Sequence, residues 1–215
     1  QLQQSSCKTC PTGYYCNGTT ITATNYPCPS GHYCPSGTQF ATQYPCPIGT
    51  FGNVTGFTSV SNCLPCTSGS YCDATGLSQP VGLCQAGYFC GGGANSSTPQ
   101  TNVSNYQISY TGTTCVTTPT NVVNGLCPQG HYCPVGSKAP VQCPQGTNST
   151  STGLPSSANC QSCTAGYYCP NNGTILATQP CSGGYYCPSG TASLTVSLEC
   201  PLGNSCPLGS ATPLP

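Results

Sequence analysis

Charged side chains are nearly absent from this sequence. Its 215 residues include two basic side chains, Lys8 and Lys138, and two acidic ones, Asp73 and Glu199. Nucleic acids and anionic membranes attract proteins through clustered Lys and Arg, so neither partner is expected. General acid–base catalysis by paired carboxylates has no plausible pair here, and we expect no enzyme, no catalytic residues and no cofactor.

Apolar side chains are also scarce. Leu, Ile, Val and Phe together number 30, Met and Trp are absent, and no apolar run approaches the roughly 18 residues of a membrane helix. We therefore expect neither a conventional apolar core nor direct membrane insertion in this segment. The residues shown include no signal peptide, and we interpret the chain as a mature or fragmentary ectodomain.

Cysteine, in contrast, is abundant. The 22 cysteines make up about one residue in ten, a proportion typical of secreted scaffolds in which disulfides take the place of a core. Each bond stabilises a fold by roughly 2–4 kcal/mol, because it lowers the entropy of the unfolded chain. The composition predicts an oxidising environment, and hence an extracellular or cell-surface localisation.

The cysteine spacings show that the chain is a repeat. A short unit, C-x-x-G-x-[YF]-C, begins at Cys10, Cys28, Cys66, Cys84, Cys127, Cys163 and Cys181, with a degenerate copy from Cys200 to Cys206. A longer unit of 16 enclosed residues runs from Cys46 to Cys63 and from Cys143 to Cys160. The order C-x2-C-x5-C-x11-C-x5-C begins three times, at Cys7, Cys63 and Cys160.

The residue types within the short unit predict its local structure. Pro presets φ and Gly supplies a positive φ, so a tight turn is expected between the two cysteines. The Tyr or Phe before the second cysteine is expected to pack on disulfides and prolines. The 27 Gly and 22 Pro disfavour long helices.

The predicted fold class is therefore small and disulfide-rich: an elongated tandem array of short β-hairpin or turn modules with little or no helix. We divide the array into residues 1–62, residues 63–159 with an insertion around 91–125, and residues 160–215, which the next copy or subunit continues.

The strings CPxGxYCPxGT and CPxGTF…NxTGxTSxxxCxxC resemble the ephrin-receptor-like cysteine-rich repeats, and more loosely the TNF-receptor and EGF-like modules. The resemblance covers nearly the whole chain except residues 91–125, and it implies an extracellular, extended, disulfide-laddered architecture. Pairing of the TNF-receptor kind would imply the disulfides Cys46–Cys63, Cys143–Cys160, Cys10–Cys28 and Cys16–Cys34. That scheme cannot pair every cysteine with a partner in its own block. Five cysteines lie from Cys163 to Cys200 and seven from Cys66 to Cys133, and both numbers are odd.

The two ends of the sequence resemble parts of one longer unit. The residues after Cys206 match the opening of that unit, and the residues before Cys7 match its close. Our hypothesis is that Cys206 of one copy and Cys7 of the next form a joint between copies, which would extend into a filament or a longer tandem array. The alternative is that the match reflects drift among repeats.

Six N-x-[ST] sequons predict covalent N-glycans, at Asn17, Asn53, Asn95, Asn102, Asn148 and Asn172. Glycans would hydrate a surface that has almost no charge.

The C-x-x-C pairs, the two histidines and the longest Cys-free stretch do not point clearly to a functional site. The pairs Cys7/Cys10, Cys63/Cys66 and Cys160/Cys163 lack the second pair that a zinc site needs, so no metal is expected. His32 and His131 occupy a position held elsewhere by Tyr or Ser, which favours a surface turn over a ligand. The Cys-free stretch between Cys90 and Cys115 is either a surface insertion or a contact loop.

Two functions remain open at this point. The first is a structural subunit of an extracellular glycosylated fibre, filament or surface coat, resembling a mastigoneme, that self-associates head to tail. The second is the ectodomain stalk of a cell-surface receptor or adhesin that binds a protein or carbohydrate ligand.

Overall fold

The computed structural model describes residues 9–16, 26–100, 106–111, 114–119, 124–195 and 198–215. Among them there is no α-helix, only two 3₁₀ turns, η1 (Val60–Asn62) and η2 (Ser157–Asn159). The remaining regular structure is short antiparallel strands. The predicted disulfide-rich array of small β modules is therefore confirmed.

The strands form two-stranded sheets, most of them two residues long. They pair as β1 (Thr50–Phe51) with β2 (Leu64–Pro65), β3 (Ser70–Tyr71) with β4 (Gly82–Leu83), β5 (Tyr88–Cys90) with β8 (Asn124–Leu126), β6 (Tyr106–Thr111) with β7 (Thr114–Pro119), β9 (His131–Tyr132) with β10 (Val141–Gln142), β11 (Thr147–Asn148) with β12 (Gln161–Ser162), and β13 (Tyr167–Tyr168) with β14 (Gln179–Pro180).

Disulfides close the short units locally. Each bond joins a cysteine to the one six positions later, with Cα atoms 5.8 to 6.2 Å apart, within the normal range for a disulfide. These pairs are Cys10–Cys16, Cys28–Cys34, Cys66–Cys72, Cys84–Cys90, Cys127–Cys133, Cys163–Cys169, Cys181–Cys187 and Cys200–Cys206.

Part of the pairing implied by the family resemblance is wrong. The structure has neither Cys10–Cys28 nor Cys16–Cys34, because the turn inside each short unit already brings its own two cysteines together. The bonds across the longer units, Cys46–Cys63 and Cys143–Cys160, are present as implied. Local closure also accounts for one odd count of cysteines, since Cys200 pairs with Cys206.

The longer unit is a variant of the short one. Six residues after its first cysteine, where the second cysteine of a short unit would stand, the two copies have Gly52 and Ser149. The first cysteine then bonds to a cysteine 17 positions on, just after a 3₁₀ turn. The chain therefore contains one kind of structural step. We call each step a rung, and the rungs begin at Cys10, Cys28, Cys46, Cys66, Cys84, Cys127, Cys143, Cys163, Cys181 and Cys200.

Consecutive rungs are joined by the backbone of the glycine three residues after each first cysteine, which we call the turn glycine. The carbonyl of Gly13 accepts a hydrogen bond from the N–H of Cys28, and the N–H of Gly13 donates to the carbonyl of Cys34, both at 2.8 Å. The same two bonds recur at Gly31, Gly49, Gly69, Gly87, Gly130, Gly146, Gly166 and Gly184, with Gly52 and Ser149 accepting in place of the missing cysteines.

A second set of bonds reaches one rung further. The linker after most rungs contains a glycine whose N–H donates to the carbonyl of the first cysteine of the rung before. Gly37, for example, donates to the carbonyl of Cys10, and Gly56 to that of Cys28. Equivalent bonds are made by Gly76, Gly93, Gly153, Gly173, Gly190 and Gly209. Among the described residues, these backbone bonds thus join each rung to its near neighbours.

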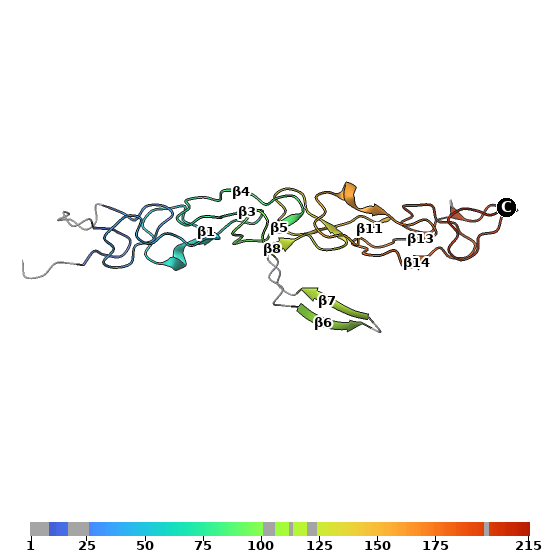
Figure 1. Cartoon of the computed structure of the whole chain (residues 1–215), viewed down its shortest axis with the longest axis horizontal. Helices are drawn as coiled ribbons and strands as arrows, with labels where there is room; N and C mark the ends of the chain where they lie inside the picture. Colours follow the sequence, from blue (N-terminus) through green and yellow to red (C-terminus); the bar gives the residue numbers. More distant parts are fainter. Residues whose placement is uncertain (1–8, 17–25, 101–105, 112–113, 120–123, 196–197) are drawn as a thin grey trace, which may run out of the picture. The chain divides into compact units, whose positions relative to one another are not determined.

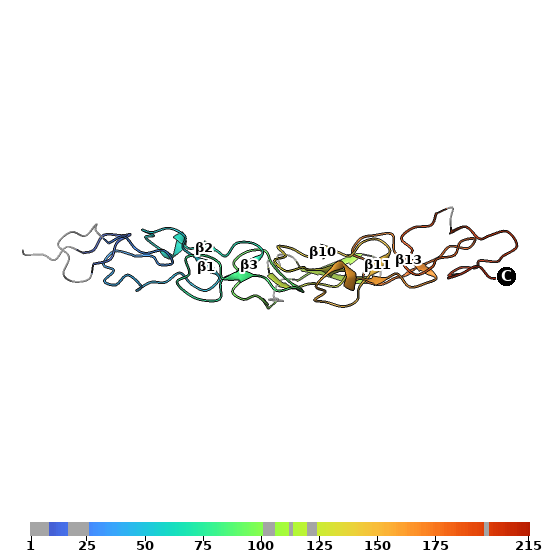
Figure 2. The same cartoon turned by 90° about the horizontal axis from the view of Figure 1, so that it is seen from above.

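The chain divides into two compact units, Gln1–Cys84 with Cys90–Pro99 and Gln85–Phe89 with Gln100–Pro215. In each unit the rungs follow one another in sequence order, as the graded colours show in two perpendicular views (Figures 1 and 2). The division into three blocks, made from the sequence repeats, remains a prediction.

The interior consists mainly of cystine sulfur. Most half-cystines are completely buried, whereas the buried apolar residues of other types, among the described part of the chain, are Phe51, Phe89 and Ala94. Phe51 packs on Cys66 and Cys72, and Phe89 on Cys127 and Cys133. Aromatic rings therefore pack on disulfides, as the sequence predicted.

We predict that alkylation of the unreduced, denatured protein labels at most two of the 22 cysteines, because the ten bonds take up the other 20. Mass spectrometry before and after reduction gives the count. Peptic fragments should contain Cys10 bonded to Cys16; a fragment with Cys10 bonded to Cys28 would contradict the structure.

A second prediction compares two glycine substitutions. Gly31 and Gly37 have φ of +82° and +83°, so alanine at either position is strained by about 1–2 kcal/mol. A Cβ at Gly31 would also overlap the carbonyl oxygen of Gly76, whereas a Cβ at Gly37 would have no atom within 4 Å. Gly31→Ala should therefore lower the denaturant midpoint clearly more than Gly37→Ala. Equal midpoints would show that the contact between rungs contributes nothing.

Candidate functional surface

An aromatic residue recurs at one position of most rungs, which we call the aromatic position. The residue two positions after each turn glycine is Tyr or Phe in eight of the ten rungs, namely Tyr15, Tyr33, Phe51, Tyr71, Phe89, Tyr132, Tyr168 and Tyr186. The exceptions are Asn148 and Ser205. Most of these rings are half-buried, so part of their surface is accessible.

Two of these rings face a second tyrosine. The residue two positions before the next rung lies across from the aromatic position, and it is Tyr26 opposite Tyr15 and Tyr44 opposite Tyr33. The ring centroids are 5.5 Å apart in the first pair and 5.6 Å in the second, within the range of favourable aromatic contacts. These pairs were not among the features predicted from the sequence, although a tyrosine two positions before a rung's first cysteine is a readable signal.

The rest of the surface is polar but almost uncharged. Asp73, Lys138 and Glu199 are exposed, and isolated apolar side chains project among the polar ones. Leu202 is 104 % exposed and Leu208 71 %. A surface of this kind has little electrostatic repulsion between copies and tends to associate.

The sequons differ in accessibility. Asn53, Asn95 and Asn172 are exposed. Asn148 is 6 % exposed, and its Nδ2, the atom that would carry a glycan, donates to the carbonyl of Ile175 at 3.3 Å. The predictions at Asn17 and Asn102 lie outside the described residues.

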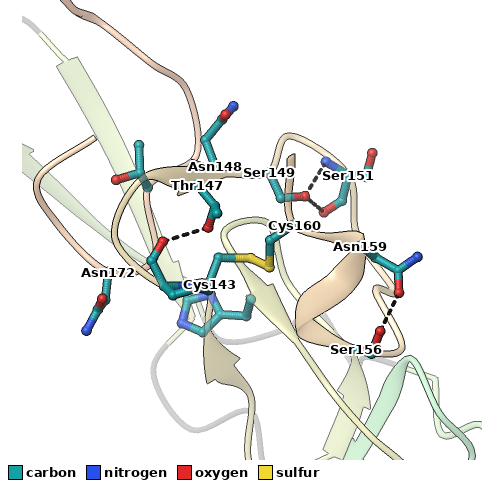
Figure 3. The surroundings of a disulfide bond; sticks show 12 residues. Cys143, Thr147, Asn148, Ser149, Ser151, Ser156, Asn159, Cys160 and Asn172 are labelled. Carbon is teal, nitrogen blue, oxygen red and sulfur yellow. Dashed lines mark hydrogen bonds between the residues drawn. A yellow bond between two sulfur atoms is a disulfide. The ribbon is translucent and has the colours of Figure 1, made fainter. Parts of the chain in front are cut away.

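The burial of Asn148 follows from the repeat. It stands five residues after Cys143, as Phe51 stands five residues after Cys46, and so it occupies the inward-facing position of the second longer unit. Figure 3 shows this unit around the Cys143–Cys160 disulfide, where Ser156 donates to Oδ1 of Asn159 at 2.8 Å and closes the 3₁₀ turn. Asn53 is two positions further along its own unit and lies outside this inward position.

The predicted joint, in which Cys206 of one copy and Cys7 of the next form one longer unit, is contradicted at Cys206. Cys206 is bonded to Cys200, and it is therefore the second cysteine of a short unit and not the opening of a longer one. The signal for this pairing is the C-P-L-G-N-S-C spacing itself, which is that of a short unit although its residues are a degenerate copy. Cys7 lies outside the described residues.

In two of the C-x-x-C pairs, the two cysteines bond to different partners. Cys63 and Cys66 belong to different disulfides, as do Cys160 and Cys163. In the part of the chain that the structure describes, no cluster of three or more His, Cys, Asp or Glu is placed to hold a metal ion. Nor does any helix there have the length and apolar character to cross a membrane.

Both histidines contact their own turns. Nδ1 of His32 lies 3.3 Å from the carbonyl oxygen of Ser30, and Nδ1 of His131 lies 2.9 Å from that of Gln129. This shared geometry is consistent with a turn position, as the sequence suggested.

The insertion after the Cys84–Cys90 rung begins beyond Ala94, which still makes the contact expected of a linker residue. Ala94 still accepts from the N–H of Cys72, as the corresponding linker residues do in other rungs. Between there and β8 the chain forms the β6–β7 hairpin, whose strands pair at six positions.

Comparison with models of known protein families found no match, and neither did comparison with curated proteins. The structure establishes a cysteine-rich repeat of small β modules. Its ten disulfides indicate a secreted or extracellular protein.

We predict N-glycans on Asn53, Asn95 and Asn172 of the secreted protein and none on Asn148. Enzymatic deglycosylation in heavy-oxygen water marks each occupied site as a labelled Asp, which peptide mass spectrometry locates. A labelled Asp at position 148 in protein that retains the Cys143–Cys160 bond would contradict the buried position of this side chain.

Proposed function

We propose that the chain is a structural subunit of an extracellular, glycosylated fibre, filament or surface coat, and that copies associate head to tail. The supporting observation is the repetition of the same backbone bonds from rung to rung. Because each rung presents the same donors and acceptors to the next, a rung of a second copy can be added by the contacts that already join rungs within one chain. Heterologous contacts build a filament when the rotation between copies does not close into a ring, and a filament is what we propose here.

The surface supports the same proposal. Side chains that would repel a second copy electrostatically are almost missing, and isolated apolar residues are exposed at turns. The joint is noncovalent in this proposal, since the sulfur of Cys206 is already bonded. Relationship to the ephrin-receptor-like cysteine-rich repeats, and a mastigoneme-like appendage as the setting, are parts of the proposal that depend on the sequence motifs alone.

A receptor or adhesin stalk is the second candidate, and one observation favours it. The β6–β7 insertion interrupts an otherwise regular series of linkers. An insertion of this kind is a common way to add a contact loop to a repeat scaffold. If this candidate is right, the chain should remain monomeric, and removal of the insertion should abolish binding to cells without unfolding the rungs.

The predicted result for a fibre subunit is concentration-dependent growth of linear assemblies, seen by negative-stain microscopy and by light scattering after size-exclusion chromatography. Leu202 stands in the turn of the Cys200–Cys206 rung, where the turn glycine, Gly203, has no atom of another rung near its Cβ position. We expect a second copy to contact this exposed turn, which makes it the expected joint, so the charge added by Leu202→Lys should weaken assembly.

Val135 provides a matched control, because it is 62 % exposed in the linker after the Cys127–Cys133 rung. Val135→Lys adds the same charge away from the expected joint and should leave end-to-end assembly unchanged. A chain that stays monomeric at all concentrations, or two variants that assemble equally poorly, would overturn the proposal.

A further inference from the structure

Two tyrosine pairs occupy the same place on consecutive rungs. The N–H of Tyr33 donates to the carbonyl of Tyr44 at 2.9 Å, and the N–H of Tyr15 donates to that of Tyr26 at 3.1 Å. The rings of Tyr33 and Tyr44 are stacked, with 28° between their planes, and those of Tyr15 and Tyr26 are tilted by 46°. In each pair, two phenol rings are therefore in contact across neighbouring segments of backbone.

We propose that these pairs are sites of oxidative coupling, at which Tyr33 bonds to Tyr44 and Tyr15 to Tyr26 as intrachain dityrosines. This inference does not depend on the proposed fibre, because both tyrosines of each pair belong to one chain.

The fold holds the Tyr33–Tyr44 pair in place from both sides. His32 and Pro45, the adjacent residues, form a β-bridge. Cys34 and Cys46, which come next, are fixed by the disulfides to Cys28 and Cys63. Little conformational entropy remains to be lost when the two rings react, and this favours coupling within the pair over coupling between molecules.

The sequence offers few competing sites for a tyrosyl radical. Trp and Met, which are readily oxidised, are absent from the whole chain, and 20 of the 22 cysteines are already in disulfides. For a radical on Tyr33, the ring in contact is another phenol. Access is also available, since Tyr26 is 39 % exposed and the other three rings are half-buried.

The reaction needs an oxidant, and hydrogen peroxide used by a haem peroxidase is the class that we propose. Each phenol loses one electron and one proton to give a phenoxyl radical. The two radicals join through a new carbon–carbon bond between their ortho carbons, and the ortho hydrogens then move to oxygen and restore both aromatic rings. In total, two hydrogen atoms leave the pair, and one hydrogen peroxide is reduced to two waters.

The test treats the secreted full-length chain with hydrogen peroxide and a haem peroxidase at low protein concentration. We expect the blue fluorescence of dityrosine in the monomer fraction, with a mass loss of two hydrogens for each coupled pair. After reduction and peptic digestion, mass spectrometry should find Tyr33 linked to Tyr44 and Tyr15 linked to Tyr26.

Phenylalanine variants provide the controls. Tyr44→Phe keeps the ring but not the phenol, so it should remove the Tyr33 cross-link and leave the one between Tyr15 and Tyr26. Tyr168 occupies the same rung position as Tyr33 but pairs across with Gln179, so Tyr168→Phe should leave both cross-links unchanged. Disulfide mapping checks that each variant is folded.

Three results would overturn the proposal. One is the absence of dityrosine under conditions that couple free tyrosine. Another is cross-linking that appears only in dimers and rises with protein concentration. The third is a yield in Tyr44→Phe equal to that of the unmodified chain, which would mean that other tyrosines react.

Discussion

The hydrogen bonds of the turn glycine hold the described array together. The carbonyl of the turn glycine accepts a hydrogen bond from the N–H of the cysteine that begins the next rung. Its N–H donates a hydrogen bond to the carbonyl of the residue that ends that rung. The glycine must lack a side chain at that point, because the carbonyl of a linker glycine lies against it: Gly56 against Gly13 and Gly190 against Gly146, at 2.9 and 2.5 Å from the Cβ position. Disulfides fix each turn, and backbone hydrogen bonds join consecutive rungs, with Phe51 and Phe89 adding side-chain packing on the disulfide of the next rung.

Disulfide bonds and backbone hydrogen bonds together stabilise this fold, as an apolar core does in other proteins. Disulfides lower the entropy of the unfolded chain and fill the interior with sulfur, while the backbone bonds determine how rungs stack. The longer units separate these two contributions. Gly52 and Ser149 have no sulfur, yet they accept and donate the same backbone bonds as the cysteines that they replace. The stacking geometry therefore does not require a disulfide at that position, provided that another cysteine closes the turn.

The sequence predicted the class of fold well because its spacings are regular. Cys, Pro and Gly at fixed separations define a turn whatever surrounds them, and the tight turn between Cys28 and Cys34 follows from those residues alone. Pairing within that unit was not predicted, because the family resemblance implied longer closures and the separation of two cysteines in sequence does not give their distance in space. The distance is set by the turn, which brings the two Cα atoms to 5.8 Å.

The surface was less predictable than the fold. Asn148 belongs to a sequon like any other in the sequence, and only the equivalence with Phe51 shows that its side chain is buried. The tyrosine pairs depend on which residue lies opposite which, and that register is set by the bonds between rungs. The repeat positions of these residues can be read from the sequence, but the burial of Asn148 and the contact within each tyrosine pair are properties of the assembled rungs.

The insertion after Ala94 shows how such a protein can change. The backbone bonds on either side of it, from Gly93 to Cys66 and from Cys127 to Gly87, are the same as in uninterrupted linkers. Since contacts are confined to near neighbours, extra residues placed in one linker impose no strain on distant rungs. New hairpins can therefore be acquired one at a time during evolution, or grafted by design, while the scaffold that carries them stays the same.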